Sequence, residues 1–172
     1  TSTLGNTIGS IAKEKAGIIK SKVPVVVAPQ TQEAIDVFHH VASDKNCPLV
    51  RVDKKFSWEK THSDLNGQTF TIRGMENVYH LQMSLLGDHQ IENAATAIAA
   101  VESMSNMDCS IPERNVNEGI LNTRWAGRCQ ILSYNGKTII VDGAHNPAAM
   151  ERLIQTIQQN CTFDKVVILL GA

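Results

Sequence analysis

Lys15 is the residue whose type fits least with its surroundings in the sequence. The segment 7–19 has the pattern of a helix that begins at Thr7, and Lys15 falls in the middle of its apolar arc. Apolar surroundings remove water from an ammonium group and favour the neutral amine, which can act as a nucleophile, form a Schiff base or take up carbon dioxide as a carbamate. The alternative is that Lys15 only covers the core with its methylene chain and keeps its charge in water. The other residues of this arc are Ile8, Ile11, Ala12, Ile18 and Ile19.

A second candidate site is the segment 142–147, which joins an expected strand to an expected helix. In open α/β sheets, ligands bind at the carboxyl ends of strands, and the first turn of a helix offers free N–H groups to an anion. Asp142 can therefore take a ribose hydroxyl, and His145 can approach a phosphate. The same pattern also fits a plain capped turn, in which Asn146 satisfies backbone donors and Pro147 occupies the first helical position.

Two further polar residues are candidates because of where they lie. Arg128 follows Trp125 and Gly127 at an expected junction, and a guanidinium group can bind two phosphate oxygens at once. Asn93 opens an alanine-rich helix directly after the segment 87–90. Each residue has an ordinary alternative, since a lone arginine in a loop is often a surface charge and an asparagine is common in the first turn of a helix.

Elements of an α/β fold must position these residues. Strand and helix alternate up to residue 52, which predicts a parallel sheet, whereas 68–83 predicts an antiparallel ribbon with Gly74 at its break. Asn135-Gly136 predicts a tight hairpin. The strands at 23–27 and 165–170 are expected to be fully buried. Helices are predicted at 7–19, 32–42, 93–102, 112–121 and from 146 onward, and strands at 23–27, 49–52, 68–73, 78–83, 129–134, 137–141 and 165–170.

Composition excludes several classes of function. The chain has 172 residues and a net charge of −1, with 16 basic and 17 acidic residues, so it has no basic field for nucleic acid. No apolar run approaches the roughly 20 residues of a membrane span. Its four scattered cysteines form no C-x-x-C pair, which favours a cytoplasmic protein. The triplet Gly136–Thr138 is not a phosphate loop, because it lies in a hairpin and Ile131 stands where the earlier glycine is required.

Five segments, in this order, together resemble the folylpolyglutamate synthases and dihydrofolate synthases of the Mur ligase superfamily. They are 4–7, 11–20, 90–97, 125–128 and 142–147. The resemblance implies an α/β fold in which 1–125 is the C-terminal part of a central ATPase domain and 126–172 begins a C-terminal ligase domain. It also implies a reaction in which ATP phosphorylates a carboxylate and the amino group of glutamate attacks the acyl phosphate, leaving an amide and ADP.

The same resemblance implies roles for individual residues. Lys15 would be carbamylated and would ligate Mg²⁺, for which a carbamate supplies anionic oxygen. Asn93, Arg128 and Asp142 would contact ATP, with Asp142 at the ribose and Arg128 at the phosphates. His145 is added because of its place beside the helix start. The substrates would be ATP, glutamate and dihydropteroate or a reduced folate, acted on by a monomeric parent enzyme.

The sequence also departs from this family. The family's phosphate loop, its other magnesium ligands and most of its pterin contacts precede the position of Thr1, and we expect both ends of the chain to be cuts within a longer protein. Phosphoryl transfer needs the loop, metals and arginine together, so we expect the chain to be inactive alone. Two alternatives stay open, namely a Mur-type ligase of peptidoglycan synthesis and a non-catalytic nucleotide-binding module.

Overall fold

Helix α1 (Ile8–Ala16) opens the part of the chain that the computed structural model describes, which is residues 7–105, 107 and 109–171. Residues 4–6 of the first matching segment lie outside this part. Thr7 caps the helix, because its Oγ1 accepts from the Ser10 N–H at 3.1 Å while its own N–H donates to Ser10 Oγ at 3.2 Å. The predicted helix start is therefore confirmed, and the helix ends at Ala16, with Gly17 as its C-cap, rather than at Ile19.

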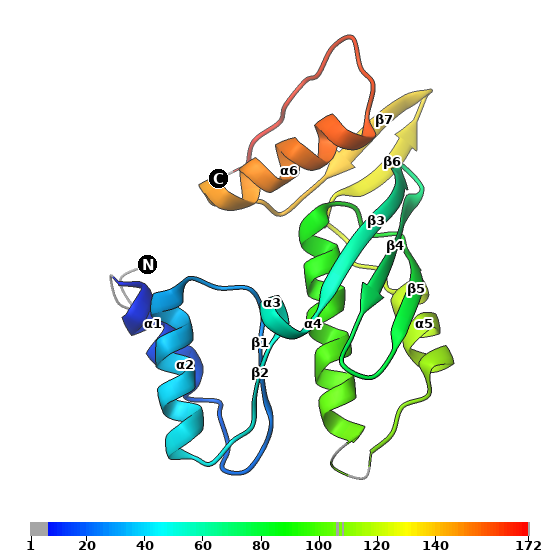
Figure 1. The fold of residues 1–172 in the computed structure, drawn as a ribbon. Helices are drawn as coiled ribbons and strands as arrows, with labels where there is room; N and C mark the ends of the chain where they lie inside the picture. Colours follow the sequence, from blue (N-terminus) through cyan, green and yellow to red (C-terminus); the bar gives the residue numbers. More distant parts are fainter. Residues whose placement is uncertain (1–6, 106, 108, 172) are drawn as a thin grey trace.

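The first sheet has two parallel strands, as predicted (Figure 1). Strand β1 (Val25–Val27) is followed by α2 (Gln32–Asp44) and β2 (Leu49–Arg51), and the short α3 (Val52–Lys55) leads away. Helix α1 packs on α2. The expectation that 23–27 is fully buried is wrong, since Val27 is buried but Val23 is 39% exposed.

The second sheet is antiparallel and carries the main core. It contains β3 (Ser57–Asp64), β4 (Gly67–Arg73) and β5 (Val78–Met83). The predicted ribbon is β4–β5, and its alternating burial matches its alternating sequence. Helices α4 (Asp88–Ser105) and α5 (Glu113–Asn122) contribute to this core. The core residues are Val52, Phe56, Phe70, Ile72, Tyr79, Leu81, Met83, Ile91, Ala94, Ala95, Ile98, Ala99 and Val116.

A hairpin and a helix complete the fold. Strands β6 (Gln130–Tyr134) and β7 (Lys137–Val141) pair as predicted around Asn135 and Gly136, whose φ angles of 49° and 71° fit the left-handed turn that suits a two-residue hairpin. Helix α6 (Pro147–Asn160) follows, and Asn146 caps it by accepting from the Ala149 N–H at 2.9 Å.

The strand predicted at 165–170 is wrong. This segment forms no strand, and its apolar side chains are exposed, with Val167 at 74% and Leu169 at 93%. A strand needs a partner for its backbone N–H and C=O groups, and no strand among the described residues pairs with this segment. The residue types of this run are common in strands, but here the run forms no strand and is not buried.

Helix α6 is held near the start of α4, where both meet β3 (Figure 1). Lys60 of β3 donates to Asp88 of α4 at 2.5 Å and to Gln159 of α6 at 3.2 Å. A second link joins Ser63 and Asn160. Gly87 has a φ of +105°, and a Cβ there would come within 2.6 Å of Thr156 Oγ1, so only glycine lets α6 approach this closely.

The whole arrangement is the α/β class that the sequence predicted. A parallel pair of strands, an antiparallel sheet and a second strand–helix unit follow one another along the chain. None of the described helices is long and apolar enough to cross a membrane.

Candidate functional site

A pocket of about 660 Å³ lies where α4, the junction after α5 and the loop before α6 meet. Three of the predicted site residues line it, namely Asn93, Arg128 and Asp142, although they come from separate segments of the chain. The remaining lining residues are Met83, Leu85, His89, Gln90, Ala94, Ala97, Ile120, Thr123, Trp125, Cys129, Asn146, Ala148, Ala149, Arg152, Leu153 and Thr156.

The pocket has an apolar part and a polar part. Met83, Leu85 and Ile120 give apolar surface, and the Trp125 ring is 66% exposed beside them. The polar part is supplied by α4, by α6 and by the two loops between them. Pockets of this size and mixed character are typical of sites for small organic ligands that carry both a ring and charged groups.

The Asp142 carboxylate joins the two loops that border the pocket. Its Oδ2 accepts from the Cys129 N–H and its Oδ1 from the Ala144 N–H, both at 2.7 Å. A third bond, from the Gly143 N–H to the Gly127 carbonyl at 2.8 Å, ties the same loops together. Asp142 therefore organises this wall of the pocket in addition to lining it.

The Arg128 side chain extends from the junction loop toward Gly143. Its Nη1 lies 3.8 Å from the point that a Cβ on Gly143 would occupy, which is van der Waals distance and places the guanidinium group beside this loop. Ion pairs within the described residues involve other side chains, which leaves the Arg128 charge free for an anion.

Asn93 lies on the face of α4 that the core leaves uncovered. His89, Asn93 and Ala97 are spaced four residues apart, so they share one face of the helix, and all three line the pocket. The Asn93 Nδ2 donates to Gln90 Oε1 at 3.0 Å, which fixes the orientation of the Asn93 amide. Asn93 and Ala97 are exposed on this face, whereas Ala94, Ala95, Ile98 and Ala99 of the same helix are buried.

Two pocket residues that the sequence analysis did not single out are charged or titratable. Burial lowers the pKa of His89, and the positive charge of Arg152 on α6 lowers it further, while Asp142 and other nearby acids oppose this. Arg152 lines the same pocket. The four-residue spacing of His89 and Asn93 along the helix could have identified His89 from the sequence. Arg152 could be identified only from the packing of α6 against α4.

His145 lies outside the lining of this pocket. It is exposed, and its Nδ1 lies 2.9 Å from the Gly143 carbonyl of its own loop. The N-terminal cap of α6 comes from Asn146 alone, so the capped turn that the sequence offered as an alternative is present in the structure.

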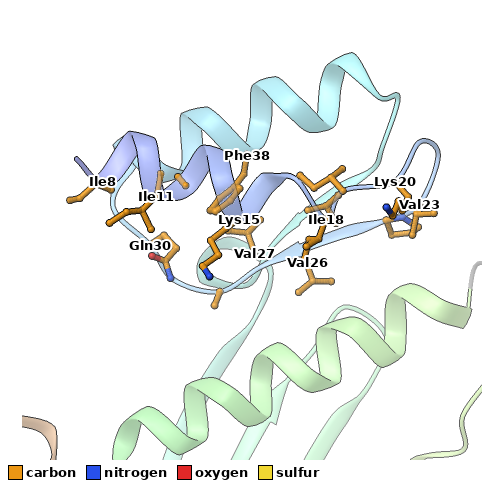
Figure 2. Close-up of a pocket in the computed structure, with 16 residues that line it drawn as sticks. Ile8, Ile11, Lys15, Ile18, Lys20, Val23, Val26, Val27, Gln30 and Phe38 are labelled. Carbon is orange, nitrogen blue, oxygen red and sulfur yellow. The ribbon is translucent and has the colours of Figure 1, made fainter. Parts of the chain in front are cut away.

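Lys15 lies in a different pocket, of about 510 Å³, between α1, α2 and β1 (Figure 2). The prediction that its surroundings desolvate it is wrong, because Lys15 is exposed. The apolar arc of α1 is only partly covered, with Ala12 and Ile19 buried while Ile8 and Ile18 remain exposed. Lys15 therefore stands beside an open apolar groove rather than in a closed core.

The described residues hold no group of three or more His, Cys, Asp or Glu side chains that could bind a metal ion. Among the described residues that line the pocket around Lys15 none is acidic, and the amide of Gln30 is the only side-chain oxygen. Mg²⁺ requires several oxygen ligands in a near-octahedral arrangement, so these residues do not fit a magnesium site by themselves.

Comparisons with known proteins match two separate parts of the chain. The family described as "Mur ligase middle domain" matches residues 4–101, and "Mur ligase, glutamate ligase domain" matches residues 127–172. A dihydrofolate synthase/folylpolyglutamate synthase of Bacillus subtilis is 31% identical over 98% of this chain and 40% of that protein.

Solved structures that are similar to this chain include folylpolyglutamate synthases. A folylpolyglutamate synthase of Thermotoga maritima is 36% identical, with a TM-score of 0.81 over 91% of this chain and 37% of its own. A complex described as FPGS-AMPPCP-folate has a TM-score of 0.85 and 31% identity over 92% of this chain and 39% of its own. The chain thus spans about two fifths of the length of these relatives. From the matched ranges and these similarities, the chain belongs to the Mur ligase family, and its relatives include folylpolyglutamate and dihydrofolate synthases.

Proposed function

We propose that this chain carries part of an ATP-dependent ligase that joins glutamate to dihydropteroate, to a reduced folate or to both. The observation that carries the proposal is the pocket that collects Asn93, Arg128 and Asp142 from three separate segments. Its mixture of apolar and polar surface suits a base, a ribose and phosphates. The folylpolyglutamate synthases among the relatives, one of which was solved with AMPPCP and folate, support the same activity.

In this proposal each pocket residue holds a different part of ATP. Arg128 binds the phosphates, because its guanidinium group is free of acidic partners in the described chain. Asp142 lies at the ribose, and Asn93 binds through the amide atoms that Gln90 leaves free. His145 remains a prediction for a phosphate contact, which would require its side chain to leave the Gly143 carbonyl.

The proposed reaction has two steps. A substrate carboxylate oxygen attacks the terminal phosphorus of ATP, and ADP leaves with the bonding electron pair. The amino group of glutamate then attacks the acyl carbon, an amide forms and phosphate leaves. The contribution of Arg128 is electrostatic, since it offsets the charge that shifts among the phosphate oxygens.

For Lys15 we keep the prediction of a carbamate that binds Mg²⁺, as the resemblance implies. The described residues around Lys15 offer no acidic partner, so no step of the reaction is assigned to the metal here. The open groove gives carbon dioxide access to the amine, while the exposure of Lys15 removes the desolvation that would favour its neutral form. It leaves the other metal ligands unassigned.

We also propose a domain boundary at residues 125 and 126. Residues 1–125 then form the C-terminal part of a central ATPase domain and 126–172 begin a C-terminal ligase domain. The ranges of the two family matches support this division, and the pocket lies across it. A monomeric cytoplasmic parent enzyme completes the proposal.

The experiment that tests the proposal is ADP release by a protein containing this chain within the full length of its relatives. Dihydropteroate and tetrahydrofolate are supplied separately, each with and without glutamate. We expect release that requires glutamate and one of the two pterins, and none from residues 1–172 alone, because the chain lacks a phosphate loop. Release that requires a peptidoglycan precursor instead would favour the other Mur-type ligases, and ATP binding without any release would favour the non-catalytic module.

A further inference from the structure

Three polar side chains of α4, those of His89, Gln90 and Asn93, form a hydrogen-bonded row along the wall of the pocket. The Gln90 Nε2 lies 3.2 Å from His89 Nε2, and Gln90 Oε1 accepts from Asn93 Nδ2 at 3.0 Å. All three residues line the pocket, and Gln90 is only 9% exposed. The central amide therefore has little freedom to bond with water in place of its two neighbours.

The donors and acceptors in this row are mutually constrained. Because Gln90 uses its oxygen to accept from Asn93, it turns its amino group toward His89. With the Gln90 amide in this orientation, His89 Nε2 is the acceptor, which places the proton of the neutral imidazole on Nδ1. At the other end, Asn93 has given one N–H to Gln90, which leaves its Oδ1 available to a ligand in the pocket.

The charges around His89 favour this neutral form near pH 7. Burial lowers the pKa of His89, and Arg152 of α6 acts in the same direction. Three carboxylates act in the opposite direction and raise the pKa of His89. One of these, Asp88, is already paired with Lys60. The opposing carboxylates are Asp142 of the loop and Glu92 and Asp88 of α4.

We propose that His89 and Gln90 are positioning residues that set the orientation of the Asn93 amide, and that protonation of His89 reverses that orientation. A protonated His89 donates from Nε2, so Gln90 must turn its oxygen toward His89 and its amino group toward Asn93. Asn93 must then turn its own oxygen toward Gln90. The Asn93 side chain then presents its amino group to the pocket as a donor, in place of its carbonyl oxygen as an acceptor. The backbone does not move.

This inference rests on the proposed function in one respect, namely that ATP is the ligand of the pocket. A ligand group that hydrogen-bonds to Asn93 Oδ1 loses its partner when the row reverses. The affinity for ATP is therefore expected to fall as the pH drops through the pKa of His89, by about threefold to tenfold, which is the effect of one hydrogen bond. Since that pKa lies below the ordinary value of about 6.5, the loss is confined to acidic pH.

The test is an NMR titration of the full chain, without ATP, from about pH 8 to about pH 5, a range that covers the histidine transition. We expect the side-chain amide signals of Gln90 and Asn93 to shift together, with the same midpoint as the His89 ring. In His89→Gln, whose side-chain oxygen can still accept from Gln90, both amides should stay constant across this range. The matched control is His80→Gln, an exposed residue bonded to Thr71 on β4, which should leave the coupled shift unchanged.

A second measurement extends the test to the ligand. ATP affinity should fall more steeply at acidic pH in the unaltered chain and in His80→Gln than in His89→Gln, where only the protonation of the terminal phosphate of ATP remains. Amides of Gln90 and Asn93 that do not follow the His89 ring would overturn the inference, whether or not ATP binds. Amides that follow the ring in a chain that binds no ATP would leave the positioning row in place and overturn the proposed function instead.

Discussion

At the scale of single residues, the loops that border the pocket depend on one carboxylate. Asp142 accepts from the backbone of the junction loop at Cys129 and from its own loop at Ala144. Removing the Asp142 charge would weaken the hydrogen bond to each loop. Each loss is expected to cost roughly 1.5–3 kcal/mol, the value of a charge-assisted hydrogen bond. A loss of ligand binding in an Asp142 variant therefore reports loop order as well as any direct contact.

Cys129 gives a prediction at the same scale. Burial, the charge of Asp142 and the neighbouring Cys161 raise the pKa of the Cys129 thiol to about 11. The reactive thiolate is then scarce at mildly alkaline pH. We expect iodoacetamide to modify Cys129 roughly a hundredfold more slowly than the exposed Cys109, as measured by mass spectrometry of the two peptides over time. Equal rates in the folded chain would contradict the burial, and equal rates in urea are the control.

At the scale of elements, α4 is the helix that connects core and site. One face packs into the main core, while the opposite face carries His89, Asn93 and Ala97 into the pocket. Near its C-terminal end the buried Glu102, 2% exposed, accepts from the Met75 N–H at 2.8 Å and from the Tyr79 hydroxyl at 3.1 Å. This carboxylate anchors the β4–β5 turn to the helix.

Replacing Glu102 should therefore destabilise the fold more than its size suggests. Glu102→Ala removes the acceptor of the buried Tyr79 hydroxyl and of the partly buried Met75 N–H, and we expect the free energy of unfolding to fall by about 3–5 kcal/mol. Glu102→Gln keeps one acceptor oxygen and should cost about half as much. Urea unfolding followed by circular dichroism measures both, with the exposed Glu59→Gln as the matched control. A change in Glu102→Ala as small as in the control would show that the anchor is not needed.

The sequence predicted most elements because their patterns are local. The cap at Thr7, the Asn135-Gly136 turn and the alternation of β4 and β5 each depend on neighbouring residues, and the structure confirms them. Burial was predicted less well, since it depends on what else packs nearby. The apolar arc around the exposed Lys15 is only partly covered, and the apolar side chains of segment 165–170 are exposed.

For the candidate site as well, features that depend on the local sequence were predicted, and a feature that depends on tertiary packing was not. Asn93, Arg128 and Asp142 were singled out from their types and local positions, and the structure brings them to one pocket. Arg152 was missed because its role depends on the placement of α6 against α4, which Lys60 and Gln159 establish over a long sequence distance.

At the scale of the whole molecule, the pocket lies between the matches to the middle and C-terminal domains. A ligand held there contacts both parts at once, so binding should strengthen their association as well as fill the pocket. The groove beside Lys15 is separate from it and shares none of its lining residues.

The most direct test of the central claim is an NMR titration of residues 1–172 with AMPPCP, the ATP analogue present in one of the similar structures. We expect the largest backbone amide shifts around Asn93, Arg128 and Asp142, and an affinity at least about tenfold weaker in Arg128→Ala. Saturable shifts in these three segments would support a nucleotide site between the two domains. An absence of shifts, or shifts confined to the groove beside Lys15, would contradict it.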